Sequence, residues 1–177
     1  MSQPFTNENI DLERLPAFES ISFAKPHPAY WKVIAISLLL WLLILGASIT
    51  ILCLLDPQIF AQISYIASAY VVLAIALFLI YRASFKKRGY ALREKDLIYK
   101  SGLIAETTTI VPLNRIQHVA LNEGLISRMF KLGKLQVYTA GGQSGHLGIA
   151  GIEIEKAKQI KEILLKKLDQ IENETIA

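Results

Sequence analysis

Two uncharged stretches decide the organisation of this chain: VIAISLLLWLLILGASITILCLL at 33–55 and IFAQISYIASAYVVLAIALFLIY at 59–81. A helix needs about 20 apolar residues to cross the hydrocarbon core of a bilayer, and each stretch is longer than that. A soluble protein rarely buries two adjacent helices of such length without a charged side chain. The two stretches therefore predict two transmembrane helices.

Three residues, Asp56-Pro57-Gln58, separate the two stretches. Aspartate is a favoured helix N-cap, and proline suits the first position of a helix. We therefore expect the second helix to begin where the first ends, so that the pair forms a tight antiparallel hairpin over 32–82. The hairpin is expected to anchor the protein in the lipid bilayer, after an N-terminal cytoplasmic tail over 1–31.

Positive charges gather at one end of the predicted hairpin, whereas the link at the other end has one aspartate and no lysine or arginine. Because cytoplasmic loops carry an excess of Lys and Arg, both termini are predicted to lie in the cytoplasm, with the hairpin in the cytoplasmic (inner) membrane. Aromatic side chains beside the spans fit an interfacial belt. The residues expected at the membrane interface are Tyr30, Trp31, Lys32, Arg82, Lys86, Lys87 and Arg88.

Neither predicted span contains Asp, Glu, Lys, Arg or His. Transporters and intramembrane enzymes usually carry such residues at depth, so both classes rank last. Small residues recur four positions apart, as Gly46 with Thr50 and Ser64 with Ser68. This spacing is typical of close helix packing, either within the hairpin or in an oligomer.

A different composition begins after the hairpin, and residues 83–171 are predicted to form a separate domain, followed by a C-terminal tail over 172–177. Strands are expected at runs that are rich in Ile, Val and Thr or that alternate apolar with polar residues. These runs are 90–92, 97–100, 104–111, 117–121, 134–139 and 146–149, with a glycine turn at 141–145. Apolar residues at helical spacing predict helices over 125–130 and 153–171. The expected fold class is α+β, with short antiparallel strands capped by one C-terminal helix.

The order of motifs after the hairpin resembles bacterial membrane proteins that carry a bacterial PH-like domain, the YdbS-like family. The motifs that carry the resemblance are GL at 102–103, VP at 111–112, RIQHV at 115–119, the 124–130 segment with LG at 132–133, and TAGG at 139–142. The resemblance covers roughly residues 25–170. It implies a pleckstrin-homology-like split β-barrel, capped by a C-terminal helix and held on a short membrane anchor. Because the family has no established enzymatic activity, it implies a fold and a location more readily than a function.

The segment VPLNRIQHVALNEG at 111–124 holds polar residues that first suggest a binding site. Arg115 follows Asn114, a common turn residue, and we expect Arg115 to shape the turn or to pair with a buried carboxylate. Its guanidinium also suits a lipid phosphate, so anion binding stays open. His118 is expected to pack beside a strand. Catalysis, metal binding and contact with an anionic ligand are the less favoured alternatives for His118.

A second basic group, Arg128, Lys131 and Lys134, flanks the apolar residues of the predicted 125–130 helix. The pattern fits either an interfacial helix or a helix whose apolar face is buried against the barrel. We expect burial against the barrel. Binding of an anion or a lipid is the alternative role of the three basic residues.

No catalytic residue, metal site or cofactor is predicted. The three histidines, His27, His118 and His146, have no spacing that suggests a shared metal, and Cys53 is the single cysteine. No nucleophile, base and acid follow one another in a recognisable motif. Nucleic acid is a weak candidate, because the net charge is only +4 and no aromatic stacking motif accompanies it.

The sequence therefore favours a non-enzymatic integral membrane protein that presents a PH-like domain at the cytoplasmic face of the membrane. Scaffolding of a partner membrane protein, or homo-oligomerisation, is the leading hypothesis. Recognition of an anionic lipid headgroup is the alternative hypothesis.

Overall fold

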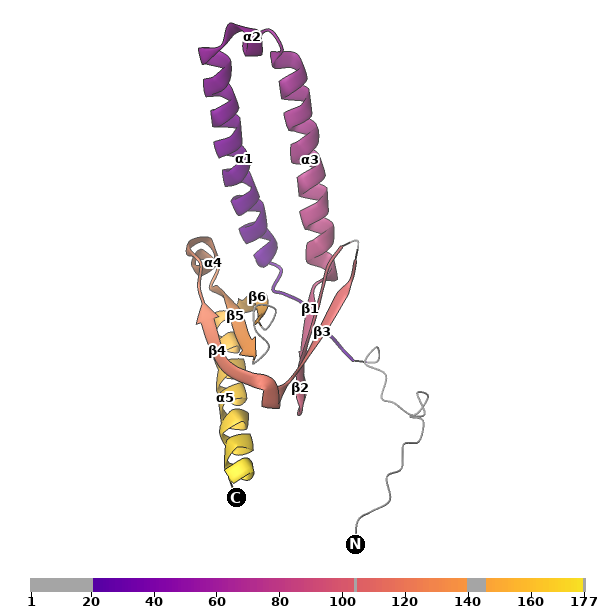
Figure 1. The fold of residues 1–177 in the computed structure, drawn as a ribbon, viewed down its shortest axis with the longest axis vertical. Helices are drawn as coiled ribbons and strands as arrows, with labels where there is room; N and C mark the ends of the chain where they lie inside the picture. Colours follow the sequence, from indigo (N-terminus) through magenta and orange to yellow (C-terminus); the bar gives the residue numbers. More distant parts are fainter. Residues whose placement is uncertain (1–20, 104, 140–145, 177) are drawn as a thin grey trace.

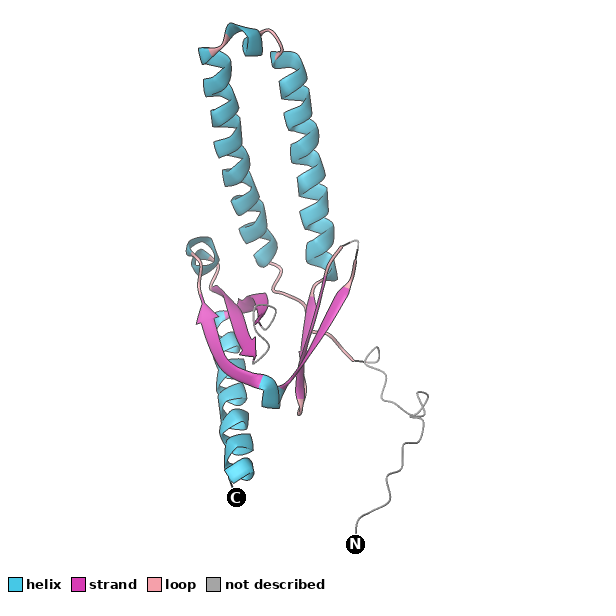
Figure 2. Cartoon of the chain, viewed as in Figure 1, coloured by secondary structure: helices cyan, strands magenta, loops and turns pink. Residues whose placement is uncertain are grey.

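The computed structural model describes residues 21–103, 105–139 and 146–176. Two long helices, α1 (Tyr30–Leu55) and α3 (Ile63–Lys87), form an antiparallel hairpin that projects from a smaller α+β domain (Figure 1). A short helix, α2 (Pro57–Phe60), joins them at the far end. The elements follow in the predicted order, with the helical hairpin first, then the strands, then a C-terminal helix (Figure 2).

Both long helices have the length and surface of membrane spans. At 1.5 Å per residue, helices of 26 and 25 residues reach about 39 Å and 38 Å, more than the ~30 Å of a bilayer core. Their large apolar side chains face outward, as Trp41 (72% exposed) and Leu54 (78%) illustrate. A core helix of a soluble protein would bury these side chains, so the exposed apolar surface fits lipid.

The link between the spans differs from the prediction in one respect. Asp56 does cap a helix, and its carboxylate accepts a hydrogen bond from the Gln58 backbone N–H at 2.8 Å. The helix that it caps is only α2, and the second span begins later, at Ile63. The single turn of α2 carries the chain across the gap between two antiparallel helices, and a continuous helix from Pro57 would have no room to turn.

The domain consists of two three-stranded antiparallel sheets. The first sheet contains β1 (Gly89–Leu92), β2 (Asp96–Ser101) and β3 (Thr107–Pro112). The second contains β4 (Ile116–Asn122), β5 (Leu132–Thr139) and β6 (His146–Glu153), with the short helix α4 (Leu125–Met129) between β4 and β5. The helix α5 (Ile154–Ile176) follows, and this architecture confirms the expected fold class.

One hydrophobic core lies between the two sheets and α5. Alternate residues along each strand point to opposite faces of a sheet, so one face of each sheet is apolar. The core includes Leu97 and Val111 from the first sheet, Leu135, Val137 and Ile149 from the second, and Ala157, Ile160 and Leu164 from α5. The helix α5 runs to Ile176, past residue 171, where the sequence suggested that a tail begins.

The 111–124 segment forms the corner between the sheets. Pro112 has no N–H to donate to a strand neighbour, and β3 ends there. The chain then makes a single 3-10 turn, η3 (Leu113–Arg115), before β4 begins. Leu113 is 2% exposed at this corner, and its N–H donates to the Lys95 carbonyl at 2.9 Å. The segment is therefore a structural turn whose apolar residues enter the core.

The residues just before α1 tie the two sheets together. Ala24 and Tyr90 exchange two backbone hydrogen bonds, of 2.8 and 2.9 Å, beside β1. The His27 N–H donates to the Gly151 carbonyl of β6 at 2.8 Å. Gly151 has φ +81°, and the Tyr30 ring packs directly on its backbone. This stretch, expected from the sequence to be part of a tail, is instead integrated into the domain.

Two predicted features lie outside the described residues. They are the glycine turn at 141–145 and the first 20 residues of the predicted N-terminal tail.

Candidate functional site at the anchor–domain junction

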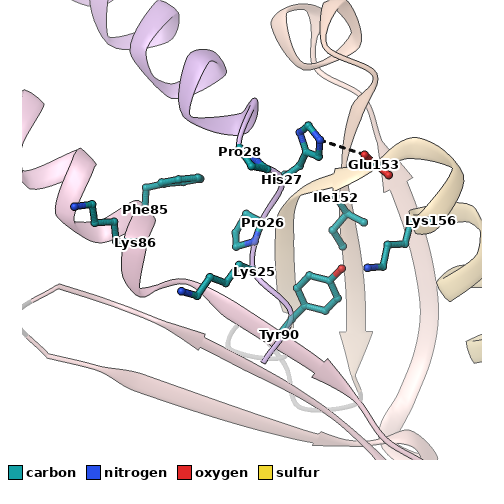
Figure 3. A pocket seen from close by; sticks show the side chains of 11 residues that line it. Lys25, Pro26, His27, Pro28, Phe85, Lys86, Tyr90, Ile152, Glu153 and Lys156 are labelled. Carbon is teal, nitrogen blue, oxygen red and sulfur yellow. Dashed lines mark ion pairs between the residues drawn. The ribbon is translucent and has the colours of Figure 1, made fainter. Parts of the chain in front are cut away.

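A cavity of about 700 Å³ lies where the membrane helices meet the domain. Its walls come from the stretch before α1, the last turns of α3, β1, the end of β6 and the start of α5. Tyr90 and Ile152 contribute apolar surface, and Phe85 of α3 lies on the side toward the hairpin (Figure 3). The cavity therefore combines an apolar floor with a position next to the membrane spans.

Three lysines from three separate elements line this cavity. They are Lys25 before α1, Lys86 in α3 and Lys156 in α5. Lys156 extends from α5 toward Tyr90, whereas Lys25 points toward the α3 side and Lys86 extends outward from α3 itself (Figure 3). No described residue forms an ion pair with any of the three. The cavity therefore presents positive charge that the described chain does not neutralise.

The one carboxylate that lines the cavity is already engaged. Glu153 lies 3.2 Å from Nε2 of His27, and the Nδ1 atom of the same ring accepts the backbone N–H of Ala29 at 3.1 Å. This chain of contacts fixes the His27 ring beside Glu153 in the wall of the cavity (Figure 3). Glu153 is thereby held toward His27.

A smaller cavity of about 230 Å³ adjoins the first, because Lys25 and Lys86 line both. It adds Lys87, Arg88 and Lys100 and one carboxylate, Glu106. Glu106 pairs with Lys87 at 3.0 Å and with Lys100 at 2.8 Å. Hydrogen bonds from Lys100 and Lys87 lower the pKa of Glu106 to about 2, so it stays charged at neutral pH.

Arg88 differs from its neighbours in this smaller cavity. Its Nε atom is buried and has no hydrogen-bond partner within the described chain. A buried donor of a charged group without a partner is costly, and such atoms usually meet a water or a ligand. Arg88 is therefore the described residue of the smaller cavity with an unsatisfied buried donor.

An aromatic cluster marks the end of the hairpin next to these cavities. Trp31 packs against Phe78 (ring centroids 5.4 Å apart) and Phe85 (6.1 Å), and Tyr30 also lies against Phe85. The Arg82 guanidinium sits 4.8 Å from the centre of the Trp31 ring. The structure thus brings most of the predicted interface residues together at one end of the hairpin, with Lys32 exposed beside them.

The two residues singled out in the 111–124 segment lie elsewhere. Arg115 is exposed at the end of η3, and no described carboxylate pairs with it. His118 is exposed on β4 and stacks on Tyr138 of β5 with ring centroids 4.2 Å apart. On the other side of Tyr138, the His146 ring lies at 6.3 Å. Among the described residues, no group of three potential metal ligands gathers anywhere.

The expectation that the 125–130 helix buries its apolar face against the barrel is wrong. Leu125 is 84% exposed and Met129 78% exposed. The helix α4 has only five residues and stands at the edge of the domain, so it turns just Ile126 and Phe130 partly inward. Helical spacing identified the apolar residues correctly but gave no information about what covers them.

The basic residues around α4 do not form one anion site. Arg128 and Lys131 line a cavity of about 590 Å³ that also holds three carboxylates, Glu123, Glu153 and Glu155. Lys134 instead lies on the outer face of β5, with its side chain across Gly148. The three carboxylates that line the cavity with Arg128 and Lys131 disfavour an anionic ligand there.

Only part of the junction site could be predicted from the sequence. Lys86, Lys87 and Arg88 were expected at the interface because they follow a span directly. Lys25 and Lys156 were not expected there, because they come from opposite ends of the chain. Only the packing of the segment before α1 onto β6 brings them to one cavity.

A family model described as Bacterial PH domain matches residues 14–168. The chain belongs to this family. Two relatives of the bacterial PH domain protein come from Bacillus subtilis (strain 168), and both are called UPF0699 transmembrane proteins. The chain is 33% identical to YdbT over 82 residues, which is 46% of this chain and 17% of YdbT. It is 26% identical to YdbS over 88 residues, which is 50% of this chain and 54% of YdbS.

The chain therefore spans about half the length of YdbS and a smaller share of YdbT. No solved structure matches it. Together with the two exposed apolar helices, these findings identify a membrane protein with a bacterial PH domain.

Proposed function

We propose that the protein is a non-enzymatic membrane protein whose bacterial PH domain binds anionic phospholipid headgroups at the junction with its anchor. The observation that carries the proposal is the pair of adjoining cavities, in which Lys25, Lys86 and Lys156 have no described ion-pair partner. Arg88 adds a buried Nε without a hydrogen-bond partner in the described chain. The negatively charged phosphate of a phospholipid headgroup is a ligand that such donors complement.

The position of the cavities favours a lipid over a free anion. Lys86 belongs to the last turn of α3, and Trp31 and Arg82 mark the height at which the helices leave the hydrocarbon core. The adjoining Phe85 and Tyr90 supply apolar surface for the glycerol backbone and the first acyl carbons. A lysine near an anionic leaflet contributes about 1 kcal/mol, so three unpaired lysines contribute about 3 kcal/mol at low salt.

The direct test uses full-length protein in nanodiscs and spin-labelled lipids. The relative association of phosphatidylglycerol over phosphatidylcholine is measured for the wild type and for Lys25→Gln/Lys86→Gln/Lys156→Gln. Lys95→Gln/Lys161→Gln/Lys166→Gln removes the same charge outside both cavities and is the matched control. The proposal expects the preference for phosphatidylglycerol to collapse in the first variant and to persist in the control. An equal loss in both variants would mean that net charge alone attracts the lipid.

The orientation of the hairpin is part of the proposal, with both termini and the domain in the cytoplasm. The support is the Lys and Arg excess beside the domain and its absence from the Asp56 link. In a Cys53→Ala background, Asp56→Cys should react with a membrane-impermeant maleimide from outside intact cells. Glu162→Cys, on α5, should react only after lysis. The reverse pattern would place the domain outside.

Scaffolding or homo-oligomerisation is the second candidate, and one surface favours it. The outer face of β4–β5–β6 carries the stacked rings of His118, Tyr138 and His146 beside small residues at Ala120 and Gly148. A flat face with an aromatic row is suited to a protein partner. Cross-linking in native membranes at Tyr138, replaced by a photoreactive phenylalanine, tests this role. Recovery of uncross-linked monomers alone would argue against it.

A further inference from the structure

The tip of the domain next to α1 carries its most exposed apolar side chains. Leu125 and Met129 of α4 are 84% and 78% exposed. The next most exposed large apolar residues of the domain, such as Ile110 and Ile163, lie between 40% and 46%. Leu125 and Met129 are four positions apart in a helix and therefore lie on one face. Exposure of these two apolar side chains to water is unfavourable, so contact of this face with an apolar partner would be stabilising.

The position of α4 indicates which partner covers it. The helix contacts α1 and lies at the end of the domain that faces the hairpin, level with the start of α1 (Figure 1). Since α1 is about 39 Å long and the hydrocarbon core about 30 Å thick, the first turns of α1 lie in the headgroup layer. The helix α4 therefore stands at the height of the membrane interface.

The basic side chains around α4 fit the same position, although the cavity behind them also holds Glu123, Glu153 and Glu155. Arg128 is 70% exposed, and Glu123 approaches its Nε only at 4.0 Å. Lys131 follows α4 in a left-handed conformation (φ 54°), which turns the chain back into β5. Long basic side chains that flank an apolar face keep their charges among phosphates while their carbons rest on lipid. An apolar face flanked by Arg and Lys is typical of segments that lie in the membrane interface.

We propose that α4 is a third membrane contact, which inserts Leu125 and Met129 into the interfacial layer of the leaflet beside α1. Three contacts, α1, α3 and α4, then fix the tilt of the domain relative to the bilayer. The fixed tilt holds the junction cavities toward the headgroups. The inference does not rest on headgroup binding, because apolar insertion also occurs in a neutral membrane.

The test places a nitroxide at position 129 through Met129→Cys in the Cys53→Ala background of the full-length protein. The protein is reconstituted in vesicles of phosphatidylcholine, and collision with oxygen is compared with collision with a water-soluble nickel chelate. Leu125→Cys is the second site, in case the label disturbs position 129. Ile163→Cys on α5 is the control, because Ile163 is also an exposed apolar residue but lies on the helix that runs away from the hairpin (Figure 1).

Insertion predicts that oxygen reaches the labels at 125 and 129 more readily than the nickel chelate, and that the control shows the opposite. The same result is expected in the Lys25→Gln/Lys86→Gln/Lys156→Gln background, which separates insertion from headgroup binding. Greater access for nickel at 125 and 129 would overturn the inference. Protection from both reagents would also overturn it, because a protein surface would then cover α4.

Discussion

Gly151→Ala tests how firmly the stretch before α1 is bound to the domain. An added Cβ at this position would lie 2.5, 2.7 and 2.8 Å from three carbons of Tyr30, which is too close for any stable contact. Alanine also costs about 1–2 kcal/mol at the left-handed φ of +81°. Overpacking against the ring adds about 1–3 kcal/mol. The expected local loss is therefore about 2–5 kcal/mol.

Hydrogen exchange of full-length protein in nanodiscs measures this loss where it occurs. The reporters are the backbone N–H groups of His27, bound to the Gly151 carbonyl, and Ala24, bound to Tyr90. A loss of about 2–5 kcal/mol accelerates exchange through local opening by about thirtyfold to several thousandfold. The strands of the first sheet should keep their protection.

Gly148→Ala is the matched control on the same strand. Its new Cβ would meet only the flexible end of the Lys134 side chain, and its backbone is not left-handed. Exchange at His27 should therefore stay close to the wild-type rate. Unchanged exchange at His27 in Gly151→Ala would show that the stretch before α1 does not depend on its packing against β6.

Three further predictions follow from the charges and the core. Glu106→Gln releases Lys87 and Lys100, so the preference for phosphatidylglycerol in nanodiscs should rise, whereas Glu162→Gln should leave it unchanged. Because the pKa of Glu106 is lowered from 4.5 to about 2, its contribution to stability is present above pH 4.5 and lost as the pH falls through 2. The urea midpoint of the wild type should therefore be higher than that of Glu106→Gln at pH 7, and the two midpoints should converge near pH 2. Leu135→Ala removes a side chain with 0% exposure and should destabilise the domain by about 2–5 kcal/mol in urea, and a loss below about 1 kcal/mol would contradict this packing.

The sequence predicted the features that depend on local chemistry. A helix that crosses a bilayer needs a long uncharged run of residues. The two uncharged stretches, at 33–55 and 59–81, therefore predicted the spans without any tertiary information. Alternation of apolar residues located β5, and the strand predicted over 104–111 does end beside Pro112, which lacks an N–H. The order of motifs then supplied the family, and with it the fold of the domain.

The features that sequence reasoning missed depend on contacts between distant residues. The helical spacing of 125–130 defined an apolar face but not its partner, and the structure leaves that face open beside α1. The pairing of His118 and His146 across Tyr138 depends on the register of three strands. Lys25 and Lys156 reach one cavity only after the segment before α1 has packed on β6. These contacts could not be predicted from the spacing of residues in the sequence.

Covalent capture can show whether an anionic headgroup occupies the junction cavities. Phosphatidylglycerol with a photoreactive headgroup is activated in nanodiscs that hold the full-length protein, and the modified peptides are mapped by mass spectrometry. If the headgroup binds in these cavities, adducts should be concentrated at 25–28, 86–90 and 152–156 and should be lost in Lys25→Gln/Lys86→Gln/Lys156→Gln. Adducts that are spread evenly over the domain, or that are unchanged in that variant, would mean that the headgroup does not bind there.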